Sequence, residues 1–247
     1  MDTSIAVFIP DGLHRDKPYQ ITYLLHGLKG NHNNWADYTL LPLYALDYQS
    51  IFVMPAVSRS FYTDMVYGQK FFSYVADELP EVCKHRYLIY LQKEKIQGLL
   101  ALLWGAYGAL KIALTKPENY GFCGAISAAG LFLKEGLIFQ RENESQVIEG
   151  FGEQINNDFK SIFGPRLEWK PEYEILELAK KINEAKCKPR IYMSCGTEDV
   201  VYYKDNSRFK DQIEKFDFDF TYEEWAGEHN LHFFNEALKK TLDVYFK

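Results

Sequence analysis

Short apolar runs alternate along the chain with segments in which apolar residues recur at helical spacing. Runs of strand length occur at 4–10, 19–26, 51–55, 96–102, 121–127 and 190–195, and a period-two run occurs at 216–222. Helical spacing occurs at 68–85, 106–115, 172–186, 206–216 and 231–246. Because strands joined by crossover helices build a mostly parallel sheet, this alternation predicts an α/β fold with helices flanking a central sheet.

The domain organisation follows from length and from one unusual stretch. A chain of 247 residues is within the usual size of a single α/β domain, so one domain over 1–247 is expected. Between the fifth and sixth apolar runs, residues 128–189 hold polar and glycine-rich turns as well as a helical segment. This stretch is interpreted as a partial lid inserted over the sheet.

The net charge and the cysteine content limit which partners and which cellular location are expected. Lys and Arg number 28 against 34 Asp and Glu, a net charge of −6, which argues against a nucleic-acid partner. The uncharged run 96–110 is too short for a membrane span, which needs about 20 apolar residues. The four cysteines are far apart, so we expect reduced thiols, a cytoplasmic location and no metal site. The sequence leaves a homo-oligomer open.

A first candidate site is the polar loop that follows the second apolar run. The run ends in His26 and Gly27, and Leu28 and Lys29 begin the loop. A loop at the carboxyl end of a parallel strand presents backbone N–H groups where open α/β folds bind ligands. Taken alone, the pattern also fits an ordinary turn.

Two further residues carry acid–base chemistry at strand ends. Asp199 follows the run 190–195, and His229 directly precedes the last helix. A carboxylate in this position can orient an imidazole, but Asp199 also suits a helix cap and His229 a polar loop.

The segment GLLALLWGAYGALKIAL, residues 98–114, makes a family resemblance specific. It resembles the esterase D and tributyrin esterase group of α/β-hydrolases, whose members carry G-L-S-M-G-G-Y-G-A-L-K here. The stretch YTDMVYGQKFFSYVADELP, residues 62–80, is similar as well. The likeness extends over almost the whole chain and implies an α/β-hydrolase fold.

The resemblance implies hydrolysis of carboxylic esters by a Ser–Asp–His triad without metal or cofactor. Asp199 and His229 occupy two of the three places, but Leu103 stands where the nucleophilic serine is expected. The backbone N–H groups of Leu28 and Trp104 would form the oxyanion hole. The expected pocket comprises His26, Gly27, Lys29, Ala101, Gly105, Ala106 and Ala129.

Leucine has no nucleophilic atom, so esterase activity is expected to be lost. Three explanations stay open: a site remodelled by engineering, a natural non-catalytic homologue, or an esterase with a displaced nucleophile such as Lys29. The expected partner is a small-molecule ester or, for a binding protein, an apolar or aromatic ligand in a pocket beside Leu103 and Trp104.

Overall fold

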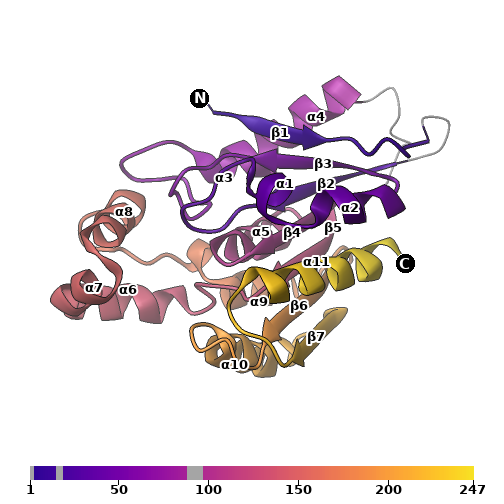
Figure 1. The fold of residues 1–247 in the computed structure, drawn as a ribbon. Helices are drawn as coiled ribbons and strands as arrows, with labels where there is room; N and C mark the ends of the chain where they lie inside the picture. The colour runs from indigo at the N-terminus through magenta and orange to yellow at the C-terminus, as the bar shows by residue number, and fades with distance from the viewer. Residues whose placement is uncertain (1–2, 15–18, 88–96) are drawn as a thin grey trace.

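The computed structural model describes residues 3–14, 19–87 and 97–247, and its layers are visible in Figure 1. Within these residues a seven-stranded sheet has the order β1-β3-β2-β4-β5-β6-β7. The strands are β1 (Ile5–Phe8), β2 (Gln20–Leu25), β3 (Ser50–Pro55), β4 (Gln97–Leu102), β5 (Tyr120–Ile126), β6 (Arg190–Gly196) and β7 (Phe220–Trp225). β1 pairs antiparallel with β3, and every other neighbouring pair is parallel. The predicted α/β architecture is therefore confirmed.

Helices cover both faces of the sheet because the strand residues are apolar on both sides. In β4, Leu99 and Ala101 face a core built with α5 and α9, whereas Leu100 faces a second core built with α2 and α11. The helices are α1 (Asn34–Tyr38), α2 (Leu41–Tyr44), α3 (Phe71–Ser73), α4 (Leu79–Tyr87), α5 (Trp104–Thr115), α6 (Leu133–Glu142), α7 (Glu144–Phe151), α8 (Glu153–Phe163), α9 (Ile175–Ile182), α10 (Tyr203–Ile213) and α11 (Leu231–Phe246).

Several predicted boundaries were wrong; the helix expected over 206–216, for example, is α10 at Tyr203–Ile213. The helix expected over 68–85 is divided, with a π-helical segment (Tyr74–Glu78) between α3 and α4. The helix expected over 172–186 ends at Ile182. The strand expected over 216–222 starts only at Phe220, because the Phe216 N–H still bonds to Ile213 O in the turn that closes α10. The start predicted for β4, residue 96, lies outside the described residues.

The segment 128–189 has two parts. Its helices α6, α7 and α8 pack on one another and extend beyond the sheet at the left of Figure 1. Helix α9 instead packs against α5 and belongs to the layer that covers the sheet. The expected lid bounds therefore include one helix of the main core.

In the part of the chain that the structure describes, no helix has the length and apolar character needed to cross a membrane.

Candidate active site

The turn from β4 into α5 has the backbone geometry of a nucleophile elbow. Leu103 has φ 57° and ψ −120°, a combination that L-residues with side chains rarely adopt. Its N–H donates to Ile126 O at 3.1 Å, and its carbonyl accepts the Ala129 N–H at 3.1 Å. Strand β5 and the loop that follows it therefore hold the turn in place, although the residue at its apex is a leucine.

The strain at this turn can be measured with two truncations of one side chain. We expect Leu103→Gly to be more stable than Leu103→Ala by about 1–2 kcal/mol, because only glycine adopts this φ and ψ without steric cost. In a helix the order is reversed, since alanine is favoured over glycine by about 1 kcal/mol. Urea denaturation of the two variants tests this, and an alanine variant as stable as the glycine variant would contradict the strain.

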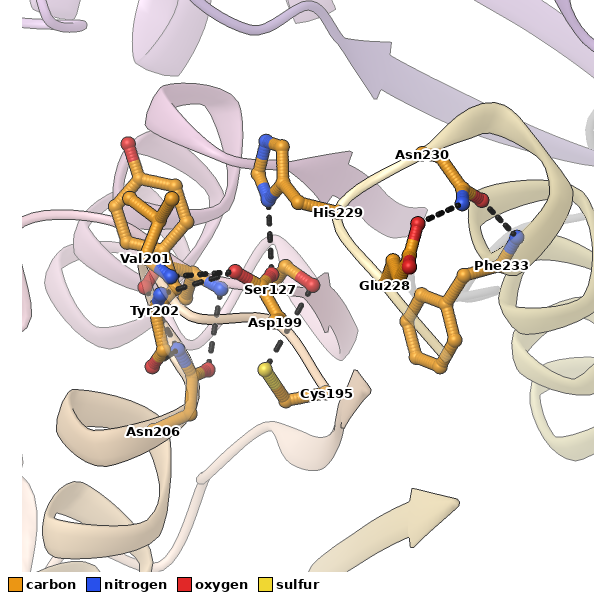
Figure 2. A network of polar contacts seen from close by, with 11 residues as sticks. Ser127, Cys195, Asp199, Val201, Tyr202, Asn206, Glu228, His229, Asn230 and Phe233 are labelled. Carbon is orange, nitrogen blue, oxygen red and sulfur yellow. Dashed lines mark hydrogen bonds and ion pairs between the residues drawn. The ribbon is translucent and has the colours of Figure 1, made fainter. Parts of the chain in front are cut away.

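Asp199 and His229 are brought together at the carboxyl ends of β6 and β7. His229 Nδ1 lies 2.8 Å from Asp199 Oδ2, as Figure 2 shows. The other carboxylate oxygen, Oδ1, accepts the N–H groups of Val201 at 3.1 Å and Tyr202 at 3.0 Å. Asp199 therefore bonds both to the turn before α10 and to the imidazole, whereas the N-cap residue of α10 itself is Tyr202.

The ionisation of Asp199 suits this role. Its side chain has no exposed surface, and burial raises its pKa. The hydrogen bond to His229 and those from the backbone N–H groups of Tyr202 and Val201 outweigh burial, so the pKa is lower than usual. Asp199 is thus an anion at neutral pH and holds His229 by a charge-assisted hydrogen bond.

Close backbone contact between Gly196 and Gly227 allows Asp199 and His229 to meet. A methyl group on Gly196 would lie 2.2 Å from Gly227 O, so the loops after β6 and β7 touch through their backbones. On the other side of His229, the Asn230 side chain accepts the Phe233 N–H at 3.1 Å and caps α11. The histidine is therefore fixed between a tight loop contact and a capped helix.

The loop after β2 is held by its own histidine. His26 Nδ1 lies 2.8 Å from Gly27 O, and the Val57 N–H donates to His26 Nε2 at 3.2 Å. Because an N–H can donate only to a lone pair, Nε2 is unprotonated and Nδ1 carries the hydrogen. Burial lowers the pKa of His26, in keeping with this neutral form.

The loop after β2 is also connected to a buried lysine of helix α5, Lys111. The Tyr62 hydroxyl donates to His26 O at 2.8 Å, and Lys111 Nζ donates to Thr63 Oγ1 at 2.9 Å. Burial lowers the pKa of Lys111 to about 7. These contacts connect helix α5 to the backbone of the loop after β2.

Gly105 sets the distance between the elbow and this loop. A methyl group on Gly105 would lie 2.5 Å from Leu25 O and 2.7 Å from His26 O. Helix α5 therefore begins in direct backbone contact with the end of β2, which brings Trp104 and Leu28, the two residues expected to form an oxyanion hole, to the same edge of the sheet.

An apolar cavity of about 170 Å³ lies on the loop side of Leu103. The loop after β2, helix α1, the end of β4 and the start of α11 line it, and Tyr38 and Leu231 in its wall are exposed to solvent. A methyl group on Gly27 would lie 3.0 Å from Leu103 Cδ1. The leucine side chain therefore lies against the loop whose backbone N–H groups would polarise an ester carbonyl.

Several residues expected in the pocket are placed elsewhere. Of that set, His26 and Gly27 line the cavity, whereas Lys29 is exposed to solvent and contributes nothing to its wall. Ala101, Gly105, Ala106 and Ala129 are buried in the packing of α5 and β5 and do not line it. The Trp104 ring, expected beside the pocket, packs into the core instead. Its centroid lies 4.7 Å from that of the Phe61 ring and 5.6 Å from that of the Phe159 ring.

Sequence reasoning missed most of the true cavity wall, which comprises Trp35, Tyr38, Thr39, Leu102, Leu231 and Phe234 among others. A partial signal was present, because Leu231 and Phe234 stand three residues apart on one helix face directly after His229. No cluster of His, Cys, Asp and Glu side chains within the described residues is suited to a metal ion.

The parallel sheet, the elbow after β4 and the Asp–His pair at the ends of β6 and β7 define an α/β-hydrolase. The esterase family model described as "Putative esterase" matches residues 1–244, and the chain belongs to this family.

Individual proteins of known name are similar to this chain. An acetyl esterase of Caldicellulosiruptor saccharolyticus is 26% identical over 223 residues, which are 90% of this chain and 81% of that protein. The substrate-bound structure of a fluorophosphonate-binding serine hydrolase from Staphylococcus aureus has a TM-score of 0.78 and 23% identity, covering 98% of this chain and 92% of its own. S-formylglutathione hydrolase from the same organism also has a TM-score of 0.78 and 23% identity, with 99% and 93% covered.

Proposed function

We propose that this protein is a member of the esterase family that does not hydrolyse esters by the family's acyl-enzyme route. The observation that carries the proposal is Leu103 at the apex of a nucleophile elbow. An acyl-enzyme needs an oxygen, sulfur or nitrogen nucleophile at this point, and a leucine side chain supplies none.

The surroundings of Leu103 support the same conclusion. Its side chain lies against Gly27 in the loop expected to supply the Leu28 N–H to an oxyanion. An ester carbonyl would meet a hydrocarbon group in that space. Lys29, a possible replacement nucleophile, is on the surface and outside the cavity. The proposal concerns the chemistry of the site and holds whether engineering or natural divergence placed the leucine there.

A fluorophosphonate probe tests the proposal, because it labels activated serine nucleophiles. The parent protein should stay unlabelled, and its hydrolysis of p-nitrophenyl acetate should equal that of His229→Ala. Removing a triad nucleophile costs on the order of 10⁶ in turnover. Stoichiometric labelling of any serine, mapped by mass spectrometry, would support a displaced nucleophile instead.

A second candidate function is binding of an apolar small molecule without turnover. The observation that favours it is the apolar cavity beside Leu103, in which the leucine forms part of the wall. A serine in this position would present a hydroxyl, whereas leucine adds hydrocarbon surface that favours an apolar ligand.

We also propose a cytoplasmic location. All four cysteines are free, and Cys83, Cys123 and Cys195 are buried. Free thiols are the usual state in reducing compartments.

A further inference from the structure

The size of the cavity beside Leu103 limits what it can hold. Its volume is about 170 Å³. An engineered protein cavity of about 150 Å³ lined by aliphatic and aromatic side chains stays dry and binds benzene. A single six-membered ring or a short branched hydrocarbon therefore fills it, and a two-ring compound would extend out past the exposed Tyr38 and Leu231.

The wall of the cavity limits the polarity of the ligand. Trp35, Leu103 and Phe234 supply aromatic and aliphatic surface, and no charged side chain among the described residues lines it. An ionised ligand buried here would meet no side chain of opposite charge in this described wall, which is strongly unfavourable.

Several polar side-chain groups in the wall already have partners, whereas the Trp35 Nε1–H is buried without one among the described residues. Both ring nitrogens of His26 have backbone partners, and Asn34 Oδ1 accepts the Asn31 N–H at 2.7 Å. The Thr39 hydroxyl donates to Trp35 O and accepts the Leu41 N–H. A ligand that needs several hydrogen bonds would have to break these contacts.

From these features we propose that the cavity between the loop after β2 and the start of α11 binds a neutral, monocyclic, hydrocarbon-like molecule in contact with Trp35 and Leu103. The inference rests on the non-hydrolytic binding function proposed above and deepens it. It moves the binding position away from Trp104, whose ring is packed against Phe61 and Phe159.

Leu103 limits the size of the cavity toward the elbow. It forms the wall of the cavity nearest the elbow, with Cδ1 directed at Gly27. Leu103→Ala removes three carbon atoms from this wall and opens the cavity toward the elbow. The variant should therefore bind a two-ring compound more tightly than the parent protein does.

Iodobenzene is a suitable probe because its heavy atom quenches tryptophan fluorescence on contact. The chain has four tryptophans, Trp35, Trp104, Trp169 and Trp225, and only Trp35 lines the cavity. Iodobenzene should quench the parent protein saturably, with half-saturation on the order of 1 mM or lower. Trp35→Phe should remove the saturable quenching, and the matched control Trp104→Phe should retain it.

Two further probes test size and charge. 4-Iodobenzoate should bind at least about tenfold more weakly than iodobenzene because no charged side chain in the described cavity wall pairs with its carboxylate. 1-Iodonaphthalene should bind Leu103→Ala at least about tenfold more tightly than the parent protein, because the truncation admits its second ring. This size shift needs no change at Trp35, so it keeps the proposal testable even where Trp35→Phe fails to fold.

The outcomes separate this inference from the function on which it rests. Absence of saturable quenching by iodobenzene, or equal binding of the benzoate, would overturn the assigned ligand class. Quenching lost in Trp104→Phe but kept in Trp35→Phe would overturn the position of the site while leaving apolar binding intact. Fluorophosphonate labelling would instead overturn the loss of hydrolysis, whatever the quenching shows.

Discussion

Leu103→Ser should hydrolyse p-nitrophenyl acetate on the order of 10³ times faster than the parent protein. The backbone at position 103 already has the elbow geometry, and Asp199 already orients His229 at 2.8 Å. The substitution supplies the missing hydroxyl and removes the hydrocarbon that leans over Gly27. A complete triad is worth on the order of 10⁶ in turnover.

The gain should be incomplete for a local reason. Members of the esterase family that this chain resembles carry glycine at the positions of Ala101 and Ala106. Both alanines are fully buried around the elbow. Their methyl groups restrict small adjustments of the turn, so the new serine will not reach the best attacking position.

Two controls isolate the chemistry. Leu103→Ala opens the same space without a nucleophile and should stay at the parent rate, whereas Leu103→Ser with His229→Ala should lose nearly all of the gain. Leu103→Ser should also become reactive toward a fluorophosphonate. A folded Leu103→Ser protein that is no faster than Leu103→Ala would show that the geometry no longer supports acyl transfer.

Gly105→Ala should destabilise the protein by about 3 kcal/mol, with a loss of the activity gained in Leu103→Ser. The new methyl group would lie 2.5 Å from Leu25 O and 2.7 Å from His26 O, and both are backbone atoms of the strand and loop that α5 contacts. Overpacking against backbone that cannot move costs about 1–3 kcal/mol or more. Helix α5 must shift away from β2, which separates the elbow from the loop.

Gly136→Ala is the matched control because it makes the same change in another helix. Nothing lies within 4 Å of a methyl group at Gly136 in α6, and alanine is favoured over glycine in a helix by about 1 kcal/mol. This variant should therefore be more stable than the parent in urea denaturation. Two shifts of the same sign would show that helix propensity, and not contact with β2, decides the role of Gly105.

The order of elements follows from local pattern, because burial on both faces of a sheet requires apolar runs that the sequence displays directly. β3 was expected at 51–55 and occupies Ser50–Pro55, and the last helix was expected and found at 231–246. Boundaries differed where a tertiary contact or a turn competed with the periodicity, as at the end of α9 and the start of β7. Local spacing carries no information on those contacts.

The roles of the site residues are likewise determined partly by the sequence and partly by the tertiary structure. Residue identity alone rules out a nucleophile at Leu103, and motif position alone selects Asp199 and His229 for the other two places. Whether those two side chains meet depends on the contact between Gly196 and Gly227, which lie on different loops. The cavity wall is likewise assembled from the loop after β2, α1, β4 and α11. Side chains so distant in the chain share no periodicity, so their convergence is a property of the packed sheet and its helices.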